Sequence, residues 1–139
     1  MIEESMSTSP IDDPRKLSAL LARVADLAQT HEVGSVIIGM SAPTGDLMFP
    51  EFVDFLRSAL RVEDAIFRMT RERAIVHLAD SEISNGKSVF VRLLEDFIEE
   101  FPAAKDPEFQ ITYFEFKAGD EKVKSKDVLK EIFPQRLLH

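Results

Sequence analysis

The chain has 139 residues, of which 45% are hydrophobic and 30% are charged, a composition typical of one globular domain. It contains no cysteine, which excludes disulfides, thiolate catalysis and cysteine-ligated metal sites. The net charge of −8 argues against general binding to nucleic acid or to an anionic membrane. No apolar run approaches the roughly 20 residues of a membrane span, and the N-terminus lacks the features of a secretory signal. We therefore expect a cytoplasmic protein without membrane insertion.

The N-terminal half is predicted to hold two helices around one buried strand. Residues 1–12 lack hydrophobic periodicity and are expected to form a flexible tail, so that a single domain spans 13–139. Apolar residues at helical spacing predict a helix over 13–31. The run 33–40 is nearly all apolar, which predicts a strand buried on both faces. A second helix is expected to begin near Asp46, whose carboxylate suits an N-cap.

The C-terminal half is predicted to continue with a hairpin, a helix, a strand and a short helix. Two apolar runs joined by a polar link predict a β-hairpin over 65–78. A loop over 81–87 is followed by a helical stripe of apolar residues that ends before Pro102. The aromatic and β-branched run 109–116 predicts a strand, and the spacing over 128–133 predicts a last helix.

The predicted order of elements is α, β, α, β, β, α, β, α. Without the outer helices this is β-α-β-β-α-β, the ferredoxin-like arrangement. We expect an α+β fold whose palm-like core is an antiparallel sheet of four to five strands. Both central helices should cover one face, flanked by the N- and C-terminal helices. Such a fold hosts many unrelated functions and does not name one by itself.

One motif series in the middle of the chain points to a family. The series has a Gly-Asp pair, apolar helix positions, an R-x-x-D motif and a further arginine at fixed offsets: Gly45-Asp46, Phe49, Val53, Leu56, Arg61, Asp64 and Arg68. This spacing resembles the central stretch of the GGDEF family, the diguanylate cyclases, over about 36 residues. The resemblance implies the fold described above. It also places Thr70-Arg71-Glu72-Arg73-Ala74 at the position of the family's signature.

The first strand departs from the family in its metal-binding residues. The family's cyclases join two GTP molecules with two metal ions, which are held by acids on the first strand and on the hairpin. Divalent magnesium requires hard oxygen ligands, usually carboxylates. The segment 33–44 contains no acidic residue, and 39–41 (Gly-Met-Ser) stands where the first-strand acids would fall. We therefore expect no bound metal and no cofactor.

The signature hairpin departs from the family as well. Thr70 and Arg71 replace two glycines that would let the backbone approach a phosphate closely. Arg73 replaces an acid, and Glu72 alone cannot hold a two-metal site. The resemblance thus implies a degenerate domain without catalytic residues, and we expect that the protein is not an enzyme.

The R-x-x-D motif is retained, and the resemblance gives it a role. In the family this motif is an inhibitory site for the product, cyclic di-GMP. The implied ligand site consists of Arg61 and Asp64, with Arg68 nearby. Arginine suits such a ligand because its planar fork can bind a phosphate or a guanine edge through two hydrogen bonds. A purely structural role stays open, since a cation near a helix C-terminus is favoured by about 0.3–1 kcal/mol without any ligand.

Two functions remain from the sequence. The first is an inactive GGDEF-like domain that serves as a regulatory protein-interaction module in bacterial signalling, with a protein partner or a second copy of itself. The alternative is a cyclic di-GMP receptor that binds the ligand through Arg61 and Asp64. Neither function involves a nucleic acid polymer.

Overall fold

The computed structural model of the chain describes residues 11–104, 107–119 and 124–133. Its helices and strands follow the predicted order. The helices are α1 (Pro14–Thr30), α2 (Met48–Ala59), α3 (Ile83–Glu100), the 3-10 helix η2 (Pro102–Ala104) and α4 (Ser125–Ile132). The strands are β1 (Ser35–Ser41), β2 (Ala65–Thr70), β3 (Arg73–Ala79) and β4 (Gln110–Phe116).

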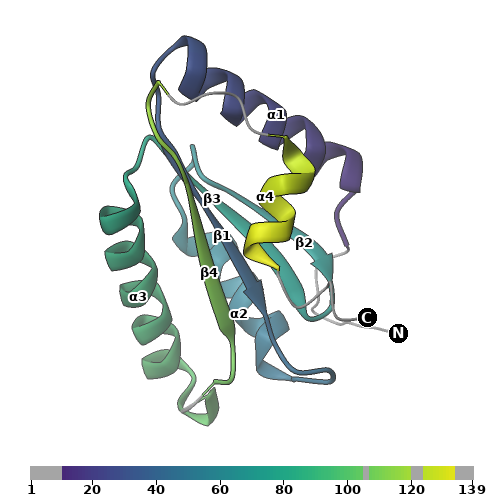
Figure 1. The fold of residues 1–139 in the computed structure, drawn as a ribbon. Helices are drawn as coiled ribbons and strands as arrows, with labels where there is room; N and C mark the ends of the chain where they lie inside the picture. Colours follow the sequence, from purple (N-terminus) through teal and green to yellow (C-terminus); the bar gives the residue numbers. More distant parts are fainter. Residues whose placement is uncertain (1–10, 105–106, 120–123, 134–139) are drawn as a thin grey trace.

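The strands form one antiparallel sheet between two layers of helices. Over the described residues, the sheet has four strands in the order β2-β3-β1-β4. Helices α2 and α3 cover one face, and α1 and α4 cover the other (Figure 1). The predicted ferredoxin-like α+β fold is confirmed, with both central helices on one face and the terminal helices flanking the core.

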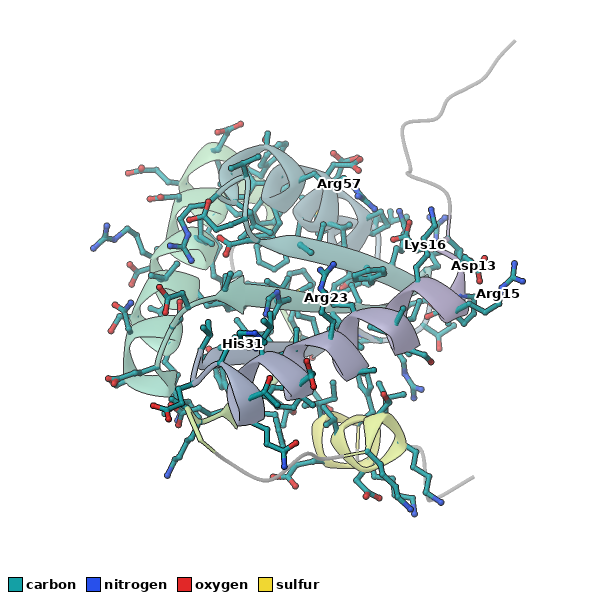
Figure 2. The ribbon with its side chains drawn as sticks, turned by 90° about the horizontal axis from the view of Figure 1, so that it is seen from above. Asp13, Arg15, Lys16, Arg23, His31 and Arg57 are labelled. Atoms are coloured by element: carbon teal, nitrogen blue, oxygen red, sulfur yellow. The ribbon has the colours of Figure 1, made fainter. Side chains whose placement is uncertain are left out.

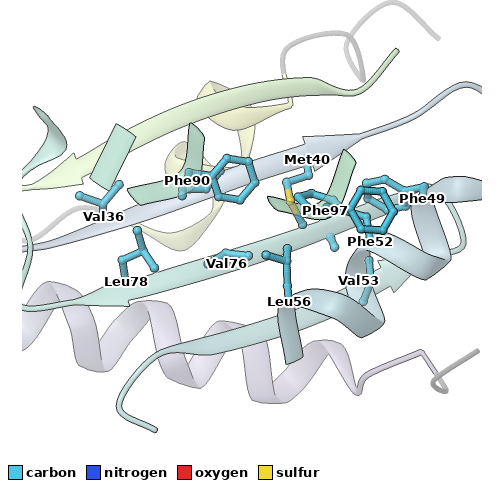
Figure 3. Packing of buried hydrophobic residues seen from close by; sticks show 12 residues of the cluster. Val36, Met40, Phe49, Phe52, Val53, Leu56, Val76, Leu78, Phe90 and Phe97 are labelled. Carbon is cyan, nitrogen blue, oxygen red and sulfur yellow. The ribbon is translucent and has the colours of Figure 1, made fainter. Parts of the chain in front are cut away.

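The cluster between the sheet and helices α2 and α3 is rich in aromatic rings (Figure 3). Phe52 of α2 lies at its centre and is fully buried. Its ring centroid is 5.8 Å from that of Phe90 and 5.0 Å from that of Phe97, both on α3. Phe109, just before β4, stacks on Phe52 at 5.4 Å. These contacts join α2, α3 and the sheet by burying large rings together.

A second cluster lies on the opposite face, under α1 and α4. Ile37 of β1 and Ile75 of β3 meet apolar side chains of both helices there. Strand β1 is therefore buried on both faces, as predicted, because its alternate side chains enter different clusters. Gly39 lets α4 approach β1, since an added Cβ would lie only 2.8 Å from the Cβ of Ile132.

Helix α3 begins earlier than predicted. It starts at Ile83, within the segment 81–87 that was predicted to be a loop. Serine, asparagine and glycine in its first turns have weak helix propensity, which hides the helix in the sequence. At Gly86, α3 packs closely on the sheet, because an added Cβ would lie 3.2 Å from the Val36 side chain of β1.

An aspartate stabilises the start of α1 and another the start of α2. Asp13 is the N-cap of α1 and accepts a hydrogen bond from the Arg15 N–H at 2.9 Å. Asp46 lies one residue before Leu47, the N-cap of α2, and accepts from the N–H groups of Met48 and Phe49 at 2.8 and 2.9 Å. Its carboxylate therefore binds the first N–H groups of the helix, one position earlier than the predicted N-cap.

The predicted tail extends into the structured part of the chain. Residues 1–10 lie outside the described residues. Asp12 belongs to the fold, because its N–H donates to the Arg68 carbonyl at 2.9 Å and its carboxylate accepts from the Arg68 N–H at 2.7 Å. Among the helices described, none is long and apolar enough to cross a membrane.

Candidate functional site

The R-x-x-D motif forms the turn that connects α2 to β2. Helix α2 ends at Ala59, and Leu60 donates its N–H to the Leu56 carbonyl as the C-cap. The Asp64 N–H then bonds to the Arg61 carbonyl at 3.0 Å, which closes a tight turn. The motif therefore places its two charged side chains on the same side of this turn.

The carboxylate of Asp64 is almost fully buried, with 2% of the side chain exposed. Arg61 donates to it from Nε and from Nη2, each at 3.0 Å, which makes a two-bond fork. The backbone N–H groups of Ala79 and Arg61 add bonds of 2.9 and 3.2 Å. Arg61 Nη2 also donates to the Ala79 carbonyl at 2.9 Å. The motif thus fastens the α2–β2 turn to the end of β3.

The guanidinium of Arg61 still reaches solvent, because 52% of its side chain is exposed. Its Nη1 lies 3.3 Å from the carboxylate of Glu63. The hydrogen bonds from Arg61 to Asp64 hold the pKa of Arg61 above its usual value. A hollow of about 160 Å³ lies beside the pair, against the end of α2 and the first half of α3, and Asn85 and Val89 line it. A ligand could therefore contact Arg61 from this side while Asp64 stays engaged.

Arg68 does not join this pair. It lies opposite Ala74 of β3, whereas Asp64 contacts Ala79, five residues further along the strand and roughly 16 Å away at about 3.3 Å per residue. Arg68 is 2% exposed, and burial lowers the pKa of its guanidinium. The predicted site residues therefore divide into two groups at opposite ends of the hairpin.

The hairpin end gathers several charged side chains. Arg57 of α2 comes within 3.6 Å of the Asp12 carboxylate, beside the first turn of α1 (Figure 2). The charges of Arg57 and Arg71 contribute to the lowered pKa of Arg68, and those of Asp54 and Glu72 oppose it. This end of the sheet therefore carries both arginine and carboxylate side chains.

The signature position forms a turn of two residues, Arg71 and Glu72, between the paired Thr70 and Arg73. The Thr70 hydroxyl accepts from the Glu72 N–H at 3.2 Å. The Glu72 carboxylate accepts from the Gly45 N–H at 3.2 Å, so it faces the loop between β1 and α2. Arg73 lies over the ring of Phe133, 5.5 Å from its centroid. These side chains fill the turn and connect it to its neighbours.

The end of β1 offers no carboxylate to a metal ion. Gly39 lies against Ile132, Met40 is buried in the aromatic cluster, and Ser41 pairs with Arg73 of β3. In the described part of the chain, no three histidine, cysteine or acidic side chains come together in a group that could hold a metal.

A larger hollow, of about 720 Å³, lies next to the Arg61 hollow and shares Ser81 and Asn85 with it. Its rim carries the acidic residues Glu32, Asp80, Glu82 and Glu115. Three separate segments contribute these residues, so no local motif could have revealed the hollow. An acidic rim disfavours an anionic ligand, which leaves the Arg61 side as the better place for a phosphate.

Comparison with known proteins gives a likeness in structure only. No family model and no curated protein matches the sequence. A fragment of PelD from Pseudomonas aeruginosa PAO1 aligns with a TM-score of 0.69 and 20% identity over 88% of this chain and 46% of that one. This chain therefore spans about half the length of that fragment. A PelD fragment from strain PA14, in complex with c-di-GMP, aligns with a TM-score of 0.67 and 20% identity over 89% of this chain and 46% of that one.

Two further proteins of Pseudomonas aeruginosa have similar structures. The GGDEF domain of FimX aligns with a TM-score of 0.70 and 11% identity, over 94% of this chain and 91% of that one. The diguanylate cyclase SiaD, in complex with its activator SiaC, aligns with a TM-score of 0.64 and 18% identity over 84% of this chain and 50% of that one. At these identities the likeness establishes a common fold.

Proposed function

We propose that this chain, whose fold is that of GGDEF domains, is a catalytically inactive member of that group and acts as a regulatory protein-interaction module in bacterial signalling. The observation that carries the proposal is that the turn at the signature position holds a single acidic residue. Its one acid, Glu72, bonds to the Gly45 backbone at 3.2 Å, and no acid precedes it on β1.

Metal chemistry explains why this matters. Two metal ions in one site need several carboxylate oxygens at fixed positions. Here the segment 33–44 supplies none, and Arg71 and Arg73 add positive charge on either side of Glu72. Two cations placed against two arginines and a single carboxylate would be repelled. A domain of this fold that lacks cyclase activity would then act by binding other molecules at its surface.

Incubation with GTP and with magnesium or manganese tests the loss of catalysis. We expect no cyclic dinucleotide and no pyrophosphate above the level of a protein-free control, while an active diguanylate cyclase in the same buffer forms both. Product that disappears in Glu72→Gln would overturn the proposal, because it would show that the single acid suffices.

The alternative function is a cyclic di-GMP receptor, and the exposure of Arg61 favours it. The guanidinium is held in place by Asp64 and Ala79, yet about half of the Arg61 side chain is exposed, and Arg61 lines a hollow where a phosphate or guanine could bind. Preorganisation of this kind lowers the entropy cost of binding. The solved structure of a PelD fragment, which shares the fold, is a complex with this ligand.

Calorimetric titration with cyclic di-GMP tests the alternative. A receptor should bind with about micromolar affinity, roughly −8 kcal/mol, and Arg61→Ala should abolish the heat. The matched control is Arg15→Ala, since Arg15 is also an exposed arginine paired with an aspartate but lies on α1. No heat with the unmodified protein would leave the motif with its structural role. Loss of binding in both variants would contradict a site at Arg61.

A further inference from the structure

Strand β4 forms one edge of the sheet and, over the described residues, pairs only with β1. In an antiparallel sheet, successive residues of a strand direct their backbone N–H and C=O groups alternately to the two neighbouring strands. The Ala42 N–H donates to the Glu72 carbonyl of the next strand, so the even-numbered residues of β1 direct these groups to β3 and the odd-numbered residues direct them to β4. By this alternation, Ile111, Tyr113 and Glu115 direct their backbone N–H and C=O groups away from β1. The β4 edge therefore presents a row of donors and acceptors to the outside.

At the opposite edge of the sheet, formed by β2, outward backbone groups are bonded to another segment of the chain. On β2, the outward backbone groups of Arg68 are both bonded to Asp12, at 2.9 and 2.7 Å. The strand is also irregular between Arg68 and Thr70, where the pairing shifts. A bulge, inserted side chains and nearby charges are the devices by which proteins prevent unwanted strand pairing. The β2 edge has all of them.

The β4 edge has fewer of these devices, because over the described residues its pairing with β1 shows no shift in register. Its seven residues contain no proline and one charged residue, Glu115, whose carboxylate turns inward to the Ile83 N–H at 3.2 Å. Tyr113 lies on the α3 side and Phe114 on the α4 side, and both are only partly buried. A long, regular and apolar edge strand of this kind readily pairs with another strand.

We propose that two copies of the chain pair antiparallel through β4, about a two-fold axis at Thr112. In this register Ile111 of each copy lies opposite Tyr113 of the other, so the outward groups of both residues bond across the axis. Thr112 faces its own counterpart. Aromatic with β-branched, and threonine with threonine, are favourable cross-strand pairs. Glu115 faces Phe109, so no charge opposes a like charge.

The exposed face of α3 supports the same axis. Lys87, Val91 and Glu95 follow one another at intervals of four residues and therefore share one side of the helix. The Lys87 ammonium lies 5.4 Å from the centroid of the Tyr113 ring, which places this side next to β4. Val91, at the middle of the stripe, is 50% exposed. A two-fold axis near Val91 would bring Lys87 of each copy to Glu95 of the other, a complementary pairing of charges.

Sedimentation equilibrium of the full chain tests the proposal through charge at Thr112. We expect a dimer for the unmodified protein and monomers for both Thr112→Lys and Thr112→Glu, because each places two like charges across the axis. Mixing the two variants should restore a dimer, since opposite charges then meet. Thr44→Lys, in an exposed loop, is the matched control and should stay dimeric. Recovery in the mixture also shows that both variants are folded.

A cysteine at the axis provides a second measurement. The chain has no cysteine of its own, so Thr112→Cys introduces a single thiol. Directly opposed residues in a pair without backbone bonds have Cα atoms about 4.5 Å apart, within the range of a disulfide. We expect a cross-linked dimer under mild oxidation and none for Thr44→Cys.

Two outcomes would overturn the inference. The first is a monomeric unmodified protein, and the second is a dimer that withstands both charged substitutions. Neither outcome bears on the inactive, regulatory role proposed above, because a partner can bind elsewhere on the domain. Nucleotide incubation and ligand titration test that role separately.

Discussion

Asp64 is a buried carboxylate whose four hydrogen bonds tie a turn to a strand. Replacement by alanine would leave the Ala79 N–H without its carboxylate acceptor and would remove two hydrogen bonds of the Arg61 guanidinium. We expect Asp64→Ala to lower the free energy of unfolding by about 1–3 kcal/mol, the usual cost of a lost buried partner. Urea unfolding measures this loss.

Glu63→Ala is the matched control for this prediction, because Glu63 also contacts Arg61 but is half-exposed. Its removal should change stability by less than about 1 kcal/mol, as is usual for surface ion pairs. Equal losses in the two variants would contradict the structural role assigned to Asp64.

His77 is a buried imidazole on β3, with 8% of the residue exposed, and its Nε2 has no hydrogen-bond partner among the described residues. Burial lowers its pKa, assisted by the charge of Arg23 on α1 and opposed by that of Asp64. The unfolded chain therefore binds the proton more readily than the folded one. It follows that the His77 contribution is complete above the ordinary imidazole value of about 6.5, and is lost as the pH falls below that value towards the lowered pKa.

We expect His77→Leu to remove this part of the pH dependence. Between about pH 7 and 5, the free energy of unfolding should fall less steeply in the variant than in the unmodified protein. The control is His31→Gln, which alters an exposed histidine and should keep the original slope. Parallel curves for His77→Leu and the unmodified protein would refute the assignment.

At the scale of the elements, close contact between β1 and α4 depends on Gly39. An added Cβ would lie 2.8 Å from the Ile132 Cβ and 3.0 Å from its carbonyl oxygen. We expect Gly39→Ala to cost about 1–3 kcal/mol of stability, because α4 must move away from the sheet. Thermal or urea unfolding measures this cost.

Gly86→Ala makes an informative comparison. The added methyl would meet Val36 at 3.2 Å, a milder contact, and alanine is favoured over glycine inside a helix by about 1 kcal/mol. The two effects oppose each other, so we expect a smaller loss than for Gly39→Ala. A larger loss at Gly86 would mean that α3, and not α4, makes the less adaptable contact with β1.

At the scale of the whole molecule, β1 links two layers that would otherwise be separate. Its side chains enter the aromatic cluster on one face and the α1–α4 cluster on the other. Loss of either layer would expose one face of this central strand. The two layers should therefore unfold together, as expected of a small single domain.

The chain contains one tyrosine and no tryptophan, which gives a direct test. Tyr113 lies in the aromatic layer, with its ring centroid 6.4 Å from that of Phe90. We expect its fluorescence and the far-ultraviolet circular dichroism to report the same urea midpoint. Helical signal lost before the tyrosine signal would indicate that α1 and α4 detach first.

The sequence by itself determined the order of the elements and the α+β class. Both follow from local patterns, because the periodicity of apolar residues marks helices and strands. The early start of α3 was missed because its first turns have weak propensity and are held by packing on Val36.

Only the tertiary structure decided which distant groups meet. It brought the Ala79 backbone to Asp64 and separated Arg68 from Arg61 by most of a strand. It attached Asp12 to β2 and left β4 as the open edge. The physical reason is that strand order and register are set by how two apolar faces are buried at once, and such long-range pairing leaves no local mark in the sequence.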